Sequence, residues 1–277
     1  MLFFAYDGSL NGDWVAHYAV RFAANTASRK LRLIHIAEVS PVSHLEDRIE
    51  RIAAESKLLG VVLETEIAPC RRANVAETLL EMVPERSMLI AGTRAKPRQH
   101  AFLGGTVSAR LLQEGRFSVI AMRVMHPGVL GQPGSVLLPI AGRNQQAEFA
   151  LPLLHLLGAD LQRLHLLYVR EVSGPRVRFM SPAVTQKLLA EGRALVAPIE
   201  DEIRAGLAPH PFLLDSSVVV ADDVPMEILL CANRHHSRLI ALGASRRTLA
   251  QRIAFGNPIE HILRDSPSDV AVYRSVP

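Results

Sequence analysis

Short apolar segments alternate with amphipathic ones over the first 125 residues of the chain. The apolar segment 2–6 predicts a strand, and apolar residues recurring every three or four positions over 15–22 predict a helix after it. The other strands of this half are predicted at 31–36, 61–67, 88–91 and 118–122, and the other helices at 45–59, 75–83 and 106–113. Because parallel strands need long crossovers, this alternation predicts a parallel sheet with helices on both faces.

The same order of elements begins again after a segment rich in glycine and proline. Residues 126–134 carry no periodicity and predict a linker. Beyond it, a strand at 136–140, a helix around 149–156 and a strand at 164–169 repeat the opening pattern. The second half is longer because residues 173–206 add a proline-containing loop and one extended helix.

The repeat is also visible in the residue types. The corresponding segments are 33–36 with 166–169, 89–92 with 239–243, and 118–123 with 269–274. Such similarity indicates a duplicated domain. We therefore predict an α/β protein of two tandem, doubly wound parallel-sheet domains, 1–125 and 135–277, joined by the linker 126–134.

Candidate binding residues lie where the predicted strands of the first half end. In an open α/β sheet, ligands bind beyond the carboxyl ends of the strands. Asp7 follows the first strand, Ile36 ends the second, Gly92 follows the fourth, and Gly105 and Thr106 open the next helix. Glycine lets backbone N–H groups approach an anion, threonine adds a hydroxyl, and a helix start adds unpaired N–H groups. This arrangement predicts a phosphate cradle.

The loop between Gly92 and Gly105 is polar and basic. Its residues Arg94, Lys96 and Arg98 could add positive charge beside a phosphate, or could simply be solvated. His100 could polarise a water molecule, but a solvated loop histidine is the simpler interpretation. No Walker lysine motif, aspartate cluster or nucleophile elbow accompanies the loop. The sequence therefore favours a binding site over a hydrolase.

The spacing in this loop resembles the signature of the universal stress protein family. That signature is Gly, two residues, Gly, nine residues, Gly, then Ser or Thr. The corresponding positions here are Gly92, Thr93-Arg94, Ala95, residues 96–104, Gly105 and Thr106. The spacing matches, and Ala95 replaces one glycine. Ala95 keeps its N–H group, but a positive φ there would cost about 1 kcal/mol. The resemblance covers nearly the whole chain, as two domain-length matches.

The resemblance implies an adenine nucleotide α-hydrolase-like fold that binds ATP, with or without Mg²⁺. In the family, the acid after the first strand contacts the ribose, the residue ending the second strand frames the adenine, and the glycine loop holds the phosphates. These roles fall to Asp7, to Ile36 and to the segment ending at Thr106. By resemblance, the full set of nucleotide-binding residues is Tyr6, Asp7, Ile36, Ala91, Gly92, Arg94, Ala95, Gly105, Thr106 and Val107.

The second half departs further from this signature. Ala141 stands where the first half has its acid, and Asn257 stands where it has Thr106. Its loop begins at Gly243 and carries Arg246 where the second glycine would be. Ala141 cannot bond a ribose, and Arg246 could fill the phosphate space. We therefore expect a degenerate nucleotide site in this half.

Composition narrows the class of protein further. The apolar runs are far shorter than the ~20 residues that span a bilayer, and the amino terminus resembles no signal peptide, so we expect no membrane partner and a cytoplasmic location. The net charge of +4 comes from scattered basic residues without interleaved aromatics, so nucleic-acid binding is disfavoured. Cys70 and Cys231 show no metal-ligand spacing and are interpreted as structural thiols.

Two further polar pairs have structural interpretations. His235 and His236 adjoin at a helix end, where neighbouring side chains do not face one another as i and i+4 do. Helix capping is therefore favoured over a zinc site. Asp222 and Asp223 are predicted to lie at the amino terminus of a helix, and not to bind metal.

Three functions are compatible with these features. The leading hypothesis is a stress-response regulator in which ATP, held by the first domain, stabilises a conformation or a partner surface with little or no turnover. The second is a scaffold whose domains form an intramolecular pseudo-dimer, with a homodimer as a further option, and whose nucleotide sites have decayed. A weak ATP hydrolase is the third.

Overall fold

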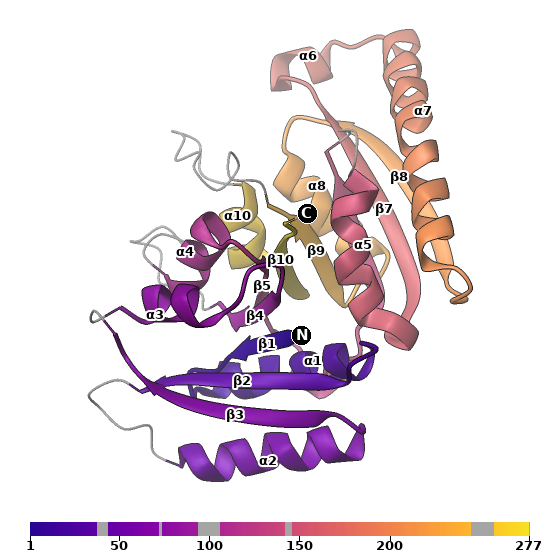
Figure 1. Ribbon diagram of the computed structural model, residues 1–277. Coiled ribbons are helices and arrows are strands. Elements are labelled where there is room, and N and C mark those ends of the chain that lie inside the picture. The colour runs from indigo at the N-terminus through magenta and orange to yellow at the C-terminus, as the bar shows by residue number, and fades with distance from the viewer. Residues whose placement is uncertain (38–43, 72–73, 94–105, 142–145, 245–257, 277) are drawn as a thin grey trace.

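The computed structural model describes residues 1–37, 44–71, 74–93, 106–141, 146–244 and 258–276 (Figure 1). The strands of the first half are β1 (Leu2–Ala5), β2 (Lys30–Ala37), β3 (Val62–Pro69), β4 (Met88–Gly92) and β5 (Ser118–Arg123). Its helices are α1 (Leu10–Ala24), α2 (Leu45–Leu58), α3 (Val75–Met82) and α4 (Val107–Glu114). The predicted alternation of strands and helices in this half is confirmed.

The second half repeats this order. Its strands are β6 (Gly134–Ile140), β7 (Leu161–Glu171), β8 (Leu213–Ala221), β9 (Leu239–Gly243) and β10 (Asp269–Arg274). Its α-helices are α5 (Gln146–Leu157), α6 (Gly174–Arg178), α7 (Pro182–Leu207), α8 (Val224–Arg234) and α10 (Pro258–Asp265). Short 3-10 turns, η1 (Pro127–Val129) and η2 (Gly158–Asp160), precede β6 and β7. The predicted extended helix is α7, and the loop predicted before it contains the short helix α6.

The ten strands in the described part of the chain form one sheet, in the order β3-β2-β1-β4-β5-β10-β9-β6-β7-β8. Neighbouring strands within each half are parallel, as predicted, whereas β5 and β10 pair antiparallel at the centre. The order is therefore symmetric about the β5–β10 pair, and the two halves share a continuous sheet instead of forming separate ones. The domain bounds 1–125 and 135–277 stay a prediction.

Helices cover both faces of this sheet and give it two apolar cores. Alternate side chains of β1 enter opposite cores, because successive residues of a strand point to opposite faces: Leu2 and Phe4 enter one, and Phe3 enters the other. The first core lies under α1, α2, α5 and α7, and the second under α3, α4, α8 and α10. Figure 1 shows α3, α4 and α10 gathered on one side of the sheet. No helix among the described residues is long and apolar enough to cross a membrane.

Several helices begin at a side chain that caps their first turn. Such a residue accepts hydrogen bonds from N–H groups that the helix itself leaves unpaired. The capping residues are Ser9 for α1, Asn74 for α3, Thr106 for α4, Ser181 for α7 and Asp223 for α8. The cap at Asp223 confirms the prediction that Asp222 and Asp223 lie at a helix amino terminus.

Contacts at the end of α1 join the two halves on one face of the sheet. The side-chain amide of Asn25 donates to the carbonyl oxygens of Leu156 and Leu157, both at 2.9 Å. Gly158 follows with a positive φ of 49°, and a Cβ at that position would lie 2.5 Å from the Asn25 side chain. Glycine at 158 therefore lets α1 and α5 approach each other closely.

Candidate functional site

Each half of the sheet reverses its strand order at one place. In the first half the chain runs from β1 outward through β2 to β3, and then returns to the other side of β1 with β4. Ligands of open α/β sheets bind at such a switch point, beyond the carboxyl ends of the strands. Asp7 follows β1 and Gly92 ends β4, so they flank this point. Ile34 of β2 pairs with Ala5 of β1. Ile36, two residues further along β2, therefore lies level with Asp7, which is two residues beyond Ala5.

The Asp7 carboxylate is exposed to solvent and held by the turn that follows β1. Its Oδ1 accepts hydrogen bonds from the backbone N–H of Ser9 at 3.0 Å and from the Ser9 hydroxyl at 2.6 Å. Ser9 in turn caps α1 by accepting from the N–H of Gly12 at 3.1 Å. A Cβ at Gly12 would lie 2.6 Å from Asp7 Oδ1. The start of α1 thus fixes the carboxylate at the switch point, where a ligand can reach it.

Three predicted site residues have side chains in the packed interior. The Tyr6 hydroxyl donates to Asp13 at 2.5 Å, and Asp13 also pairs with Arg48. Burial and the neighbouring Asp13 raise the pKa of Tyr6 well above its ordinary value. Ile36 and Ala91 belong to the core under α3 and α4. These residues position the strands around the switch point by packing.

Gly92 and Thr93 lie at the end of β4. A Cβ at Gly92 would lie 2.9 Å from the side-chain amide of Asn11 on α1, so a larger residue there would have to displace that amide. The backbone N–H of Thr93 donates to Met122 at 2.8 Å. The Thr93 hydroxyl is buried without a hydrogen-bond partner among the described residues.

Thr106 stands immediately before α4 and caps this helix. Its Oγ1 accepts from the backbone N–H of Ala109 at 3.1 Å and lies 3.3 Å from the Ser108 hydroxyl. Val107, the first residue of α4, is 37% exposed. The predicted site residues that lie outside the described part of the chain are Arg94, Ala95 and Gly105. Their roles stay predictions.

The second half contains a cavity of about 450 Å³ at its own switch point, between β6 and β9. Four of its lining residues, Ala141, Val169, Gly243 and Pro258, are the counterparts of Asp7, Ile36, Gly92 and Val107. Most of the other lining residues are apolar, with Arg170 and Glu171 as the charged exceptions. The second half therefore has an opening at the carboxyl ends of its strands, and this opening is mainly apolar and has no acid at the position of Asp7.

A comparison with known protein families identifies the family of this chain. The universal stress protein family matches residues 135–274, which is the second half. The chain belongs to the universal stress protein family. The match lies in the half that lacks the acid, whereas the loop signature lies in the first half, so the two observations rest on different residues. Membership of this family supports a role in the stress response.

Solved structures show the same fold over nearly the whole chain. A universal stress protein from Archaeoglobus fulgidus is 16% identical, with 98% of this chain and 95% of that one covered and a TM-score of 0.59. A functionally unknown protein from Pseudomonas aeruginosa PAO1 is 15% identical, with 99% and 92% covered and a TM-score of 0.59. The cytoplasmic domain of a prokaryotic cation chloride cotransporter is 14% identical, with 99% and 95% covered and a TM-score of 0.53. A search of the curated proteins gave no match.

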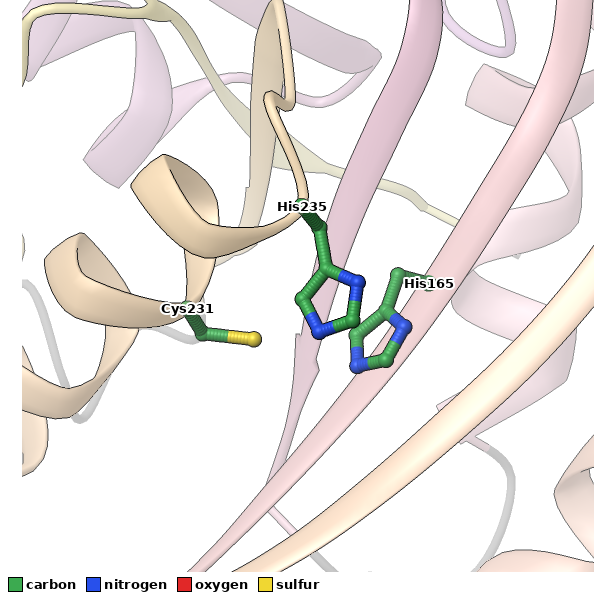
Figure 2. Close-up of side chains that lie close together, drawn as sticks. All are labelled: His165, Cys231 and His235. Atoms are coloured by element: carbon green, nitrogen blue, oxygen red, sulfur yellow. The ribbon is translucent and has the colours of Figure 1, made fainter.

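A second polar group in this universal stress protein was missed from the sequence. His165 on β7 meets Cys231 and His235 from the end of α8, and one ligand atom of each residue lies within 4.8 Å of the other two (Figure 2). The His235 ring stacks on His165 with 3.7 Å between ring centroids. The expected capping role therefore describes the His235 backbone, which ends α8, and not its side chain.

The sequence did carry a signal for two of these residues. Cys231 and His235 are four positions apart, so their side chains share one face at the end of the helix. The adjacent residue His236 is not part of the group. No local pattern marks His165, because it comes from a strand far away in the sequence. Both cysteines are free thiols.

Proposed function

We propose that the first half of this universal stress protein binds ATP at its switch point and acts in the cytoplasm as a stress-response regulator with little or no turnover. The observation that carries the proposal is the convergence of the exposed Asp7 carboxylate, the end of β4 and the start of α4 at one edge of the sheet. The cavity at the same topological place in the second half supports this edge as the place where the fold receives a ligand.

The residues around the switch point fit a nucleotide. A carboxylate accepts hydrogen bonds from ribose hydroxyls, and Asp7 is exposed for that purpose. The N–H groups at the start of α4, with Thr106, are suited to phosphate oxygens, because a helix amino terminus carries partial positive charge. The buried Thr93 hydroxyl adds one more polar group at the end of β4. In this proposal the chain's own residues bind and orient ATP and do not cleave it.

Calorimetric titration of ATP into the purified protein tests the proposal. We expect one site, weakened at least about tenfold in Asp7→Ala through the loss of a charged hydrogen-bond acceptor. Asp7→Asn keeps an oxygen for the turn at Ser9 and so separates loss of the charge from loss of the turn. Asp201→Ala, at an exposed position on α7, is the matched control and keeps wild-type affinity. Equal affinity in Asp7→Ala and Asp201→Ala would overturn the site.

A scaffold function is the alternative that a specific observation favours. The two halves share one sheet through β5 and β10, and the cavity of the second half lacks the acid of a nucleotide site. A scaffold predicts no ATP or ADP among the small molecules released from purified protein, and no heat on titration with ATP. Bound nucleotide that is lost in Asp7→Ala supports the regulator instead. Release of inorganic phosphate that disappears in Thr106→Ala would favour a weak hydrolase over both.

A further inference from the structure

His165, Cys231 and His235, which we call the His–Cys cluster, bring two imidazoles and a thiol together inside the second half. Cys231 lies in the last part of α8 and His235 is the residue that ends this helix. His165 lies in the first half of β7 and faces α8 (Figure 2). The side chains of His165 and Cys231 are each only 3% exposed, whereas His235 is half-buried. The cluster thus lies in the interior, with one residue reaching the surface.

Many of the side chains packed near the cluster are apolar. Residues 167 and 219 on the same face of β7 and β8 are Leu and Val, and Ile228 and Ala232 of α8 pack there too. Burying polar groups in such a place costs free energy unless they find partners. The Nδ1 atom of His165 is buried without a hydrogen-bond partner among the described residues. Two stacked imidazoles and an adjacent thiol therefore pack less favourably in a core than apolar side chains would. The same three side chains are common ligands of metal ions.

Further polar residues stand behind His165 on the neighbouring strand. Asp215 and Ser217 of β8 lie on the face of the sheet that His165 occupies. The Nε2 atom of His165 lies 2.8 Å from the Ser217 hydroxyl, and its Nδ1 atom lies 3.5 Å from an Asp215 carboxylate oxygen. A metal-bound histidine usually donates its other ring N–H to such a group. Whichever nitrogen binds an ion, the other therefore has an oxygen beside it.

We propose that the His–Cys cluster binds one Zn²⁺ ion. Zinc accepts thiolate sulfur and imidazole nitrogen together, with about 2.3 Å to sulfur and about 2.0 Å to nitrogen. Ligand atoms around a tetrahedral zinc are then about 3.5 Å apart. The three ligand atoms lie within 4.8 Å of one another, so they must draw closer, and the stacked imidazole rings must turn so that one nitrogen of each faces the ion. Cys231 loses its proton to solvent when the ion binds, and the histidines bind as neutral imidazoles.

Three protein ligands leave a fourth position on zinc. His235 at the exposed end of α8 gives that position a path to solvent, so water or a small donor would complete the tetrahedron. The site joins the end of α8 to β7, so zinc would stabilise the second half.

The His–Cys cluster is separate from the proposed nucleotide site. His165 lies in the first half of β7, whereas the cavity at the switch point is lined by residues 167–171, further along the same strand, and none of the three cluster residues lines it. The proposed ATP site lies in the other half of the chain. Zinc binding and ATP binding can therefore succeed or fail independently.

Metal titration of the untagged, chelator-treated protein tests the cluster. We expect one Zn²⁺ per chain, measured against a chromophoric chelator. Co²⁺ as a substitute should give the visible bands of a tetrahedral ion and a thiolate-to-metal charge-transfer band in the near ultraviolet. Cys231→Ser should abolish the charge-transfer band, and His235→Asn should weaken zinc binding by more than the roughly 10- to 100-fold typical of outer-shell changes.

Matched controls lie in the same chain. Cys70→Ser removes the other thiol, and His236→Asn removes the neighbouring imidazole at a left-handed position, φ 49°, that asparagine tolerates. Both should bind zinc and cobalt as the wild type does. His165 is deeply buried, so the test relies on Cys231 and on the half-buried His235, whose variants should keep the wild-type circular dichroism spectrum. Wild-type protein that takes up no zinc, or Cys231→Ser protein that binds cobalt with an unchanged spectrum, would overturn the proposal.

Discussion

The hydroxyl of Tyr18 donates a hydrogen bond of 2.6 Å to the carboxylate of Asp269, across 251 positions of sequence. Tyr18 lies on α1 of the first half, and Asp269 is the fully buried first residue of β10 in the second. The other oxygen of Asp269 accepts from the backbone N–H groups of Met125 at 2.6 Å and His126 at 2.9 Å. One carboxylate thus joins α1, the segment between the halves and the central strand β10.

Removing either member of this pair should destabilise the protein. Tyr18→Phe removes one hydrogen bond to a charged acceptor and should lower the free energy of unfolding by about 1.5–3 kcal/mol. Asp269→Ala leaves three donors unpaired and should cost more. Urea unfolding measures both. In the Asp269→Ala background, Tyr18→Phe should cost almost nothing, because the acceptor is already gone. Additive costs in the double variant would contradict the interaction.

Gly131 and Gly128 provide a matched pair in the segment that joins the halves. Gly131 has φ +75°, and a Cβ there would lie 2.7 Å from the backbone oxygen of His17 on α1. A Cβ at Gly128 would meet nothing within 4 Å. Gly131→Ala should therefore cost at least about 2 kcal/mol, from left-handed strain together with the clash. Gly128→Ala should leave the urea midpoint almost unchanged. Equal midpoints for the two variants would show that α1 does not pack against this segment.

Much of the architecture could be predicted from the sequence because it depends on local patterns. Apolar runs of strand length, separated by helical periodicity, specify parallel sheets and place Asp7 and Gly92 at strand ends. The antiparallel pairing of β5 with β10 could not be predicted in this way, because it depends on how two complete halves dock edge to edge. The bond from Tyr18 to Asp269 depends on the same docking, and neither residue carries a local signal of it.

The two candidate sites also differ in how far they can be predicted from local sequence patterns. The residues of the proposed Asp7 site could be assigned to strand ends because they follow strands whose order fixes the switch point, and their role as a site stays a proposal. The His–Cys cluster could be located only in part. The four-residue spacing from Cys231 to His235 is visible in the helix, but the third member, His165, meets them only through the packing of α8 on β7.

Thr106 should have two separable roles. Its Oγ1 caps α4, so Thr106→Ala should lower the free energy of unfolding by about 1 kcal/mol, while Thr106→Ser should keep the cap. Under the proposed function, Thr106→Ala should also weaken ATP binding, and Thr106→Ser should not. Urea unfolding and calorimetry on the same samples distinguish the roles. A Thr106→Ala protein that loses stability but binds ATP like the wild type would restrict Thr106 to capping.

Asp160 and Arg21 form an ion pair between the halves whose effect on stability depends on pH. Arg21 Nη1 lies 3.6 Å from Asp160 Oδ1, and both side chains are largely buried. Burial raises the pKa of Asp160 above its ordinary value, and the attraction of Arg21 offsets this only in part. The folded protein therefore keeps the Asp160 proton to higher pH than the unfolded chain does, and stability falls as pH rises from about 4 through the raised pKa.

Asp160→Asn should accordingly be at least as stable as the wild type at pH 7, despite the loss of an ion pair. Its advantage should shrink as pH falls to about 4, where the unfolded wild-type chain also begins to hold the proton. Asp201→Asn, at an exposed position on α7, should show no such trend. Arg21→Leu should destabilise at every pH, because Arg21 also donates to the carbonyl of Leu130 at 2.7 Å. Urea midpoints measured between pH 4 and 7 test this prediction. If Asp160→Asn is less stable than the wild type, and this difference grows as pH rises, then the attraction of Arg21 affects the pKa of Asp160 more than burial does.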